Sequence, residues 1–520
     1  TNTGSDSCLV TNIGLTSGTD TTSWSIPTPQ ADLTLAVNDS ATIPVTFNSS
    51  APSGNDPFTE ISFLCGTGMG GGGFPSFPGG GGITGNDNGI QMTITSQGSG
   101  TSEEKKIIFT AKATRPDIDV IPGEIDFGLV TVGCCSAEKT VRIYNGGDGT
   151  LTISPPVTVV SSDSGFTISQ PTNMELPPGQ YTEFTTRWCA SEEGPSTGII
   201  EIHSTDDNEE FFTVPLSGEG TLDNQGDDGF QQPERPMVDV LWAVDDSGSM
   251  SDEQQDLANN FSSFISTASS LDTDYHIGVV TTDSESDQSG HLYSCNSNLW
   301  ISDAQSDSQQ QSEFSCNVKT TSSGRPASDA KESPLQAMRL ALDYPNIDDF
   351  NAGFYREEAK LYLIAVTDEE DQSNGTAQQY VDYFRNLKGL GNPDLLNISA
   401  IAGPPPNGCD TASANQVDYD AVNMVGGEFR SICTADWSDI IEDLGLDVFN
   451  ARRSFTLTRP AEPSTIVIEV CDDDGAGNPV NCQTVTDWTF DGNYNTVTFG
   501  DNSVPGPQQH IKVTYTAVCY

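Results

Sequence analysis

The stretch Val238-Asp-Val-Leu-Trp-Ala-Val-Asp-Asp-Ser-Gly-Ser-Met250 decides the fold of the middle of this 520-residue chain. Residues 238–244 form an apolar run of strand length, and a tight polar turn follows them. A segment with apolar residues at helical spacing, 252–268, comes next. An apolar strand that passes through a tight turn into a helix is typical of a parallel sheet covered by helices.

The same alternation of strands and helices continues to residue 450. The expected strands are 276–281, 361–366 and 398–401, and the expected helices are 334–342, 377–387 and 437–446. This order predicts parallel βαβ units with helices on both faces of one sheet. We therefore expect an α/β, doubly wound domain over 237–450.

Oxygen-bearing side chains follow two of these strands. Asp245, Ser247 and Ser249 place one carboxylate and two hydroxyls after the first strand, and Asp368 follows strand 361–366. Open α/β sheets bind ligands at the carboxyl edge, where both strands end. Because hard cations such as Mg²⁺ prefer oxygen ligands, the pattern predicts a divalent metal site at this edge.

These residues resemble the von Willebrand factor A family and its metal-ion-dependent adhesion site. The family's D-x-S-x-S motif matches Asp245, Ser247 and Ser249, and its later Asp matches Asp368. The resemblance implies a Rossmann-like fold, bound Mg²⁺ (or Ca²⁺ or Mn²⁺), and a protein or glycan ligand at the metal edge. Glu332 stands where the family has a Thr ligand, with Ser333 beside it. A carboxylate there makes the site more negative and weakens its attraction for an acidic ligand.

Simpler roles compete with metal binding. Asp245, Ser247 and Ser249 could cap the helix that follows, since Ser and Asp are good N-caps. The acidic residues Asp246 and 369–371 could form a solvated rim. A further Ca²⁺ could bind 472–478, although this segment lacks the twelve-residue loop and final Glu of an EF-hand, and an ordinary acidic turn explains it as well.

Residues 116–220 read as short strands between turns. Alternation at 140–144 and the turn signals Asn145-Gly146-Gly147 and Pro177-Pro178-Gly179 predict an immunoglobulin-like β-sandwich. The further strands expected are 118–121, 125–130 and 198–203. The segments 125–133, 143–147 and 216–220 resemble the bacterial choice-of-anchor D/HYDIN-like group of β domains. This resemblance concerns the fold and says little about function.

Residues 1–115 look like a second copy of this sandwich, with strands at 33–37, 42–47 and 106–112 and a Gly-rich insertion at 66–89. The copy lacks the opening Phe-Gly strand and the Asn-Gly turn. Either earlier residues are absent from the chain, or a strand from a neighbouring molecule completes an open groove and drives self-assembly.

Two segments complete the domain plan. The polar stretch 221–236 is expected to be an interdomain linker. Residues 451–520 return to strands and predict a small C-terminal β-sandwich, so the whole chain is expected to combine β-sandwich domains with one α/β domain.

Composition excludes several classes of function. The chain has 74 Asp and Glu against 21 Lys and Arg, a net charge of −53, which argues against nucleic acid and anionic lipid as partners. No apolar run approaches the ~18 residues of a membrane span. Motifs of serine hydrolases, zinc proteases and P-loop enzymes are missing, so we expect no enzyme activity.

The twelve Cys, without C-x-x-C spacing or nearby His, predict disulfides in an oxidising compartment. Spacing favours Cys8–Cys65, Cys295–Cys316, Cys409–Cys433 and Cys471–Cys482. Cys189 is expected to pair with Cys134 or Cys135. The remaining one of these two and Cys519 would then join distant domains or cross-link two subunits.

Two hypotheses follow. The first is a secreted or cell-surface protein that binds a ligand or mediates adhesion through its metal site, with β domains as spacers. The second is a structural subunit of an extracellular filament or sheath, assembled by strand complementation or by disulfides.

Overall fold

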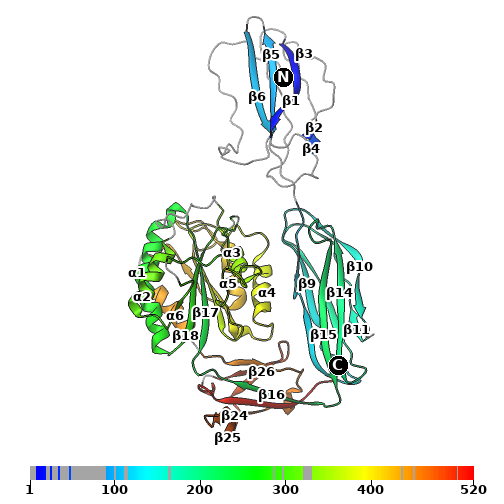
Figure 1. Ribbon diagram of the computed structural model, residues 1–520, viewed down its shortest axis with the longest axis vertical. Coiled ribbons are helices and arrows are strands. Elements are labelled where there is room, and N and C mark those ends of the chain that lie inside the picture. Colours follow the sequence, from blue (N-terminus) through cyan, green and yellow to red (C-terminus); the bar gives the residue numbers. More distant parts are fainter. Residues whose placement is uncertain are drawn as a thin grey trace. The chain divides into compact units, whose positions relative to one another are not determined.

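The computed structural model divides into two compact units, Thr1–Thr114 and Arg115–Tyr520 (Figure 1). In the first unit it describes residues 8–18, 24–25, 33–35, 46–47, 90–98 and 101–109. In the second it describes all residues except 162–164, 285, 287, 296–297, 320–330, 435–436, 449–450 and 501.

The first unit contains an antiparallel sheet in the order β3-β1-β5-β6 and a separate pair, β2 with β4. The strands are β1 (Cys8–Gly18), β2 (Trp24–Ser25), β3 (Leu33–Leu35), β4 (Thr46–Phe47), β5 (Ile90–Gly98) and β6 (Thr101–Phe109). Three of them, β3, β4 and β6, overlap the strands expected from sequence. The insertion 66–89, Cys65 and the proposed open groove involve residues outside those described, so they stay predictions.

Residues 115–221 form two facing sheets, as expected for a β-sandwich. The first sheet has the order β12-β10-β14-β15-β8 and the second β11-β13-β9-β7. Trp188 and Phe184 from the second sheet pack against Ile200 and Val214 from the first, which buries the alternate residues of each strand. The strands are β7 (Ile118–Ile121), β8 (Ile125–Thr131), β9 (Lys139–Asn145), β10 (Leu151–Ser161), β11 (Phe166–Ile168), β12 (Glu175–Leu176), β13 (Tyr181–Trp188), β14 (Gly194–Ser204) and β15 (Phe211–Thr221).

The expected linker 221–236 is wrong for its central residues, because they form strand β16 (Gln225–Gln231). This strand pairs with β28 (His510–Thr516), so the α/β domain is inserted between two segments of the C-terminal β domain. The inward residues of β16 include Gly226, which lies against the Tyr515 ring, and buried Asp228. Asp228 accepts hydrogen bonds from the Thr458 amide and the Tyr515 hydroxyl at 2.9 and 2.7 Å. A strand whose inward face is Gly and Asp has no hydrophobic alternation in its sequence.

The C-terminal domain has two sheets, in the orders β16-β28-β24-β25 and β23-β27-β26, around a core that includes Phe455, Ile468 and Val513. Phe230 of β16 packs on Phe455 with ring centroids 5.1 Å apart. The remaining strands are β23 (Ser454–Thr456), β24 (Val467–Asp473), β25 (Pro479–Val485), β26 (Trp488–Asp491) and β27 (Thr496–Phe499). A short 3-10 helix, η4 (Pro463–Thr465), precedes β24.

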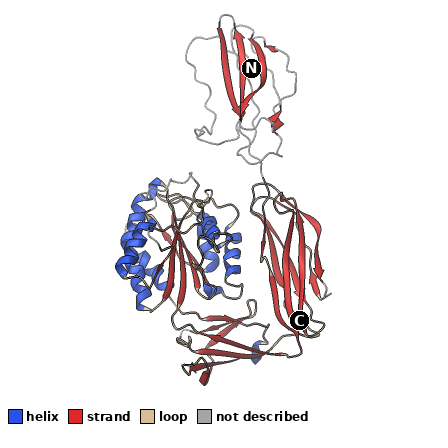
Figure 2. Ribbon diagram, in the orientation of Figure 1, coloured by secondary structure: helices blue, strands red, loops and turns tan. Residues whose placement is uncertain are grey.

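The inserted domain is a sheet in the order β19-β18-β17-β20-β21-β22, parallel except for β19. Helices α1, α2 and α6 cover one face, where Trp242 packs edge-on against Phe264 and Phe314, and α3, α4 and α5 cover the other (Figure 2). The strands are β17 (Met237–Val244), β18 (Asp274–Thr281), β19 (Ile301–Ser302), β20 (Lys360–Val366), β21 (Leu396–Ala402) and β22 (Phe429–Ser431). The helices are η1 (Gly248–Met250), α1 (Ser251–Ser270), α2 (Asp307–Val318), α3 (Pro334–Leu342), α4 (Ala377–Leu387), η3 (Pro393–Leu395), α5 (Gln416–Val425) and α6 (Ser438–Val448).

Ion pairs join the inserted domain to the sandwich that precedes it. Arg339 of α3 contacts Asp119 of β7, and Asp382 of α4 accepts hydrogen bonds from Arg142 and Tyr144 of β9. Each of the two domains thus contributes one acidic and one basic side chain to the contact. These two ion pairs together fix how the two surfaces pack against each other.

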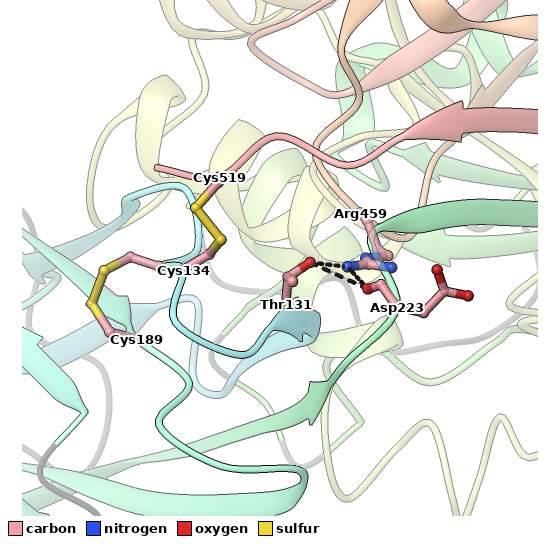
Figure 3. The surroundings of a disulfide bond; sticks show 7 residues. Thr131, Cys134, Cys189, Asp223, Arg459 and Cys519 are labelled. Carbon is pink, nitrogen blue, oxygen red and sulfur yellow. Dashed lines mark hydrogen bonds between the residues drawn. A yellow bond between two sulfur atoms is a disulfide. The ribbon is translucent and has the colours of Figure 1, made fainter.

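Disulfides join the first and last parts of this unit (Figure 3). Cys134 pairs with Cys519 near the chain end, and Cys135 pairs with Cys189. Beside the first bond, Arg459 donates to the Thr131 hydroxyl at 2.6 Å. Three predicted pairs, Cys295–Cys316, Cys409–Cys433 and Cys471–Cys482, are confirmed. Of the two alternatives for Cys519, the bond between distant domains is the one observed, because Cys519 pairs with Cys134 within the chain. Five disulfides among the described residues fit an oxidising environment.

Candidate metal centre

Asp245 is the buried centre of the carboxyl edge, directly after β17. Its Oδ1 accepts a hydrogen bond from the Ser247 amide at 2.7 Å, and its Oδ2 accepts one from the Thr367 hydroxyl at 2.7 Å. The Asp245 amide donates to the carbonyl of Val366 in β20 at 2.9 Å. These contacts bring the two turns that carry the predicted ligands side by side.

The two serine hydroxyls of the motif lie together. The Oγ atoms of Ser247 and Ser249 are 2.9 Å apart, and neither side chain caps η1 or α1 through a hydrogen bond. Helix capping therefore does not explain why these hydroxyls are present. One hydroxyl of the pair donates to the other, which leaves lone pairs on the acceptor for a further partner.

Asp368 follows β20, as the sequence predicted, and is only 8% exposed. Its carbonyl accepts from the Ser413 amide at 2.8 Å, but its Oδ1 is buried without a hydrogen-bond partner among the described residues. Buried carboxylate oxygens are rarely left without a partner, so this atom points to a group that the protein atoms do not provide.

Glu332 lies just before α3 and is also buried. Its Oε2 accepts a short hydrogen bond from the hydroxyl of Thr282, which follows β18. Its neighbour Ser333 is fully buried, and the Ser333 hydroxyl has no hydrogen-bond partner in the described part of the chain. Glu332 and Ser333 thus join the same edge as Asp245, from a third loop.

The electrostatics of this edge oppose full ionisation of its acids. Burial, reinforced by the charge of Asp368, raises the pKa of Asp245 to about 6. Burial and the charge of Asp245 raise the pKa of Glu332 to about 8. Glu253, in the first turn of α1, also has a raised pKa because of burial and the nearby Asp368. The negative charge of one acid thus disfavours the ionised form of another, and a positive charge placed among them would be favourable.

The side-chain atoms available at this edge are of the kind that hard cations prefer as ligands. They are carboxylate and hydroxyl oxygens, which suit Mg²⁺, Mn²⁺ or Ca²⁺. However, no group of three or more His, Cys, Asp or Glu side chains within the described ranges is arranged to hold a metal ion. A cation here would therefore depend on the hydroxyls of Ser247 and Ser249 together with Asp368, with Asp245 and Glu332 balancing its charge.

The second calcium candidate, residues 472–478, includes the turn between β24 and β25, and calcium binding there stays a prediction. Asp473 Oδ1 accepts from the Gly475 amide at 2.6 Å, and Asp474 Oδ1 accepts from the Ala476 amide at 2.8 Å. Asp473 Oδ2 also contacts His510 Nε2 at 2.8 Å. Contacts of this kind lower the pKa of both Asp473 and Asp474, so these carboxylates are stabilised by the protein itself.

Sequence reasoning named Ser333 beside Glu332 but missed two polar members of the edge, Thr282 and Thr367. Thr282 and Thr367 each stand next to an acid at the end of a predicted strand, and this position was the available signal. What the sequence could not show was that their hydroxyls bind Glu332 and Asp245 from different loops.

Among the described residues, no helix is both long and apolar enough to cross a membrane. No family model matches the chain, and no curated protein is significantly similar to it. Similar solved structures include a protein of unknown function from Porphyromonas gingivalis W83, with 12% identity, 42% of this chain and 86% of that chain covered, and a TM-score of 0.18. They also include proximal thread matrix protein 1 from the mussel byssus, with 12% identity, 42% and 47% coverage and a TM-score of 0.23. A third is domains 4 and 5 of the S-layer protein SbsC, with 16% identity, 25% and 57% coverage and a TM-score of 0.16. Similarity at these scores assigns neither a family nor a function to the chain.

Proposed function

We propose that the chain is a secreted or cell-surface binding protein of the von Willebrand factor A type, and that it captures a protein or glycan ligand at a divalent cation. The cation would be held at the carboxyl edge by Ser247, Ser249 and Asp368, with Asp245 and Glu332 close by. The immunoglobulin-like domains would act as spacers that display this edge.

The observations that carry the proposal are the buried, unpartnered Oδ1 of Asp368 and the serine hydroxyl pair, on two turns that the contact of Thr367 with Asp245 joins. Carboxylates that raise each other's pKa by repulsion gain stability when a cation binds between them. The disulfides support the extracellular setting, because such bonds persist in oxidising compartments.

The charge of the edge also favours one kind of ligand. When a bound cation ionises all three acids, Asp245, Glu332 and Asp368 together exceed its charge, and Asp246 and Glu369 add to the negative field at Glu332. A ligand carboxylate would meet this excess, whereas neutral hydroxyl or carbonyl oxygens would not. Neutral glycans and uncharged or basic protein surfaces are therefore the ligands that we expect.

The filament hypothesis receives less support. A disulfide route through Cys519 is not supported, because Cys519 is paired with Cys134. Its strand-complementation route concerns the first unit and stays a prediction.

Equilibrium dialysis of the full chain against Mg²⁺, Mn²⁺ or Ca²⁺, followed by elemental analysis, tests the cation. We expect one bound ion for the wild type and none for Asp368→Asn, while the matched control Asp474→Asn keeps the ion. Wild-type protein that takes up no ion would refute the site.

A glycan array and a matrix-protein array, each probed with Mg²⁺ and with EDTA, test the ligand. Binding is expected to be lost in EDTA and in Asp368→Asn. Ligand binding that survives both treatments would show that the adhesive surface lies elsewhere.

A further inference from the structure

Two buried acids, Asp371 and Asp418, lie in hydrogen-bonding contact beside the carboxyl edge. Asp371 belongs to the loop after β20, and Asp418 to the first turn of α5. The side chains are hydrogen-bonded to each other, and the residues are only 4% and 1% exposed. Neither residue belongs to the proposed metal site.

The other hydrogen bonds of the pair show which acid is ionised. Asp371 Oδ1 accepts from the Ser373 amide at 2.6 Å, and its Oδ2 accepts from the Leu335 amide of α3 at 3.2 Å. Asp418 Oδ2 accepts from the side-chain amide of Asn415 at 2.8 Å, whereas its Oδ1 has no donor among the described residues. Two backbone amides stabilise the charge of Asp371, so Asp371 is the carboxylate.

Two ionised carboxylates cannot hydrogen-bond, because neither has a donor. A proton on the Asp418 carboxyl group resolves this conflict, since it supplies the missing donor to Asp371 and removes one of two buried charges. The surroundings of Asp418 favour this protonated form, because burial and then the charge of Asp371 raise the pKa of Asp418 well above its ordinary value. Burial also raises the pKa of Asp371.

The pair connects the loop that carries Asp368 to the starts of two helices. Asp371 accepts from the Leu335 amide at the start of α3, and Asp418 belongs to the first turn of α5. Asn415 also donates to the carbonyl of Glu369 at 3.2 Å. The titratable group that faces Asp371 from α4 is Tyr380, whose hydroxyl donates to the Asn374 carbonyl of the same loop.

We propose that Asp371 and Asp418 share one proton and form a pH-sensitive latch that holds the loop after β20 against α5. Loss of the proton places two negative charges in contact inside the protein. The loop is then released from α5 at its far end, while β20 holds its near end. The latch does not require a bound cation, so it stands or falls separately from the metal site.

The test compares the wild type with Asp418→Asn, because the Asn amide donates to Asp371 at every pH. Asp420→Asn on the same helix is the matched control. In the unfolded chain Asp418 ionises above about pH 4, so the native wild type must retain a proton that the unfolded chain releases. Stability supplied by this proton is present at acidic pH and is lost as pH rises toward the native pKa.

The urea midpoint of full-length Asp418→Asn is therefore expected to exceed that of the wild type by an amount that grows as the pH rises above about 4. The control should follow the wild type. Parallel curves for Asp418→Asn and wild type would refute the latch.

Hydrogen–deuterium exchange of the wild type provides a measurement that needs no variant. Peptides that contain Leu335 and Ser373 should lose protection as pH rises, after correction for the intrinsic rate. Constant protection of these two amides would also refute the proposal, even if Asp418→Asn failed to fold.

Discussion

Arg339 and Asp119 join the α/β domain to the sandwich that precedes it through two hydrogen bonds, with N–O distances of 2.5 and 3.0 Å. Both side chains are mostly buried, and Gln379 donates a third hydrogen bond to Asp119 at 2.7 Å. The guanidinium also lies 4.4 Å from the centre of the Tyr383 ring. The two domains are thus fixed by a planar, bidentate contact that a lysine cannot reproduce.

The first prediction concerns this contact. Arg339→Met removes the base and leaves Asp119 buried, so we expect a loss of about 2–5 kcal/mol in the free energy of unfolding, measured in urea. Glu183→Gln, which weakens the exposed pair with Arg142, should change it by less than about 1 kcal/mol. Equal effects would mean that the interdomain contact contributes no more than a surface ion pair.

The second prediction concerns strand β16. A Cβ on Gly226 would lie 2.2 Å from the Tyr515 ring, whereas a Cβ on Gly229 would meet nothing within 4 Å. Gly226→Ala should therefore destabilise the C-terminal domain by about 1–3 kcal/mol, as overpacking does. Gly229→Ala on the same strand should be nearly neutral. Thermal unfolding of both variants measures this difference. An unchanged unfolding temperature for Gly226→Ala would show that β16 is not packed against Tyr515.

The third prediction concerns the bond between Cys134 and Cys519. The double variant Cys134→Ser/Cys519→Ser should lose about 2–5 kcal/mol, because the bond closes a loop of 385 residues. Opening the short Cys471–Cys482 loop in the same way should have a smaller effect on the urea midpoint. Peptide mapping of the non-reduced wild type should link Cys519 to Cys134, and a bond from Cys519 to any other cysteine would contradict the observed pairing.

The fourth prediction concerns Lys388, which is buried and donates to the carbonyls of Arg356 and Glu357. Burial lowers the pKa of Lys388 from 10.5 to about 8. Between these values the unfolded chain binds a proton that the native protein does not, so native stability rises with pH in this window.

Relative to Lys388→Met, the wild type should gain up to about 3 kcal/mol between pH 8 and pH 10.5. Urea unfolding at several pH values measures the difference, with Lys512→Met as the control. A difference that stays constant with pH would show that the native ammonium remains charged.

The sequence predicted the elements whose inward faces are apolar. Strand β17 and helix α1 were evident because Val240, Trp242 and Leu257 follow the periods of a strand and a helix. Strand β16 was missed because its inward positions include Gly226 and Asp228. Helix α2 was missed because its sequence, DSQQQSEFSCNV, is largely polar, and a capping box on Ser306 starts it instead.

For the candidate site, too, the sequence predicted some features and not others. The D-x-S-x-S motif and Asp368 could be placed at one edge because both follow apolar strands. The contacts of Thr367 and Thr282 with the acids depend on how three loops meet, which one sequence does not show. Likewise, spacing could pair neighbouring cysteines but could not choose between Cys134 and Cys135.

The insertion of the α/β domain has a consequence for biogenesis. Strand β16 ends at Gln231, but its partner β28 begins only at His510, so a nascent chain emerging from the ribosome or a translocation pore cannot complete the C-terminal sheet until residues 510–516 appear. The nested α/β domain has all of its own strands long before that point. The C-terminal sheet thus closes in a late step, in which β28 docks on β16 and Cys519 reaches Cys134.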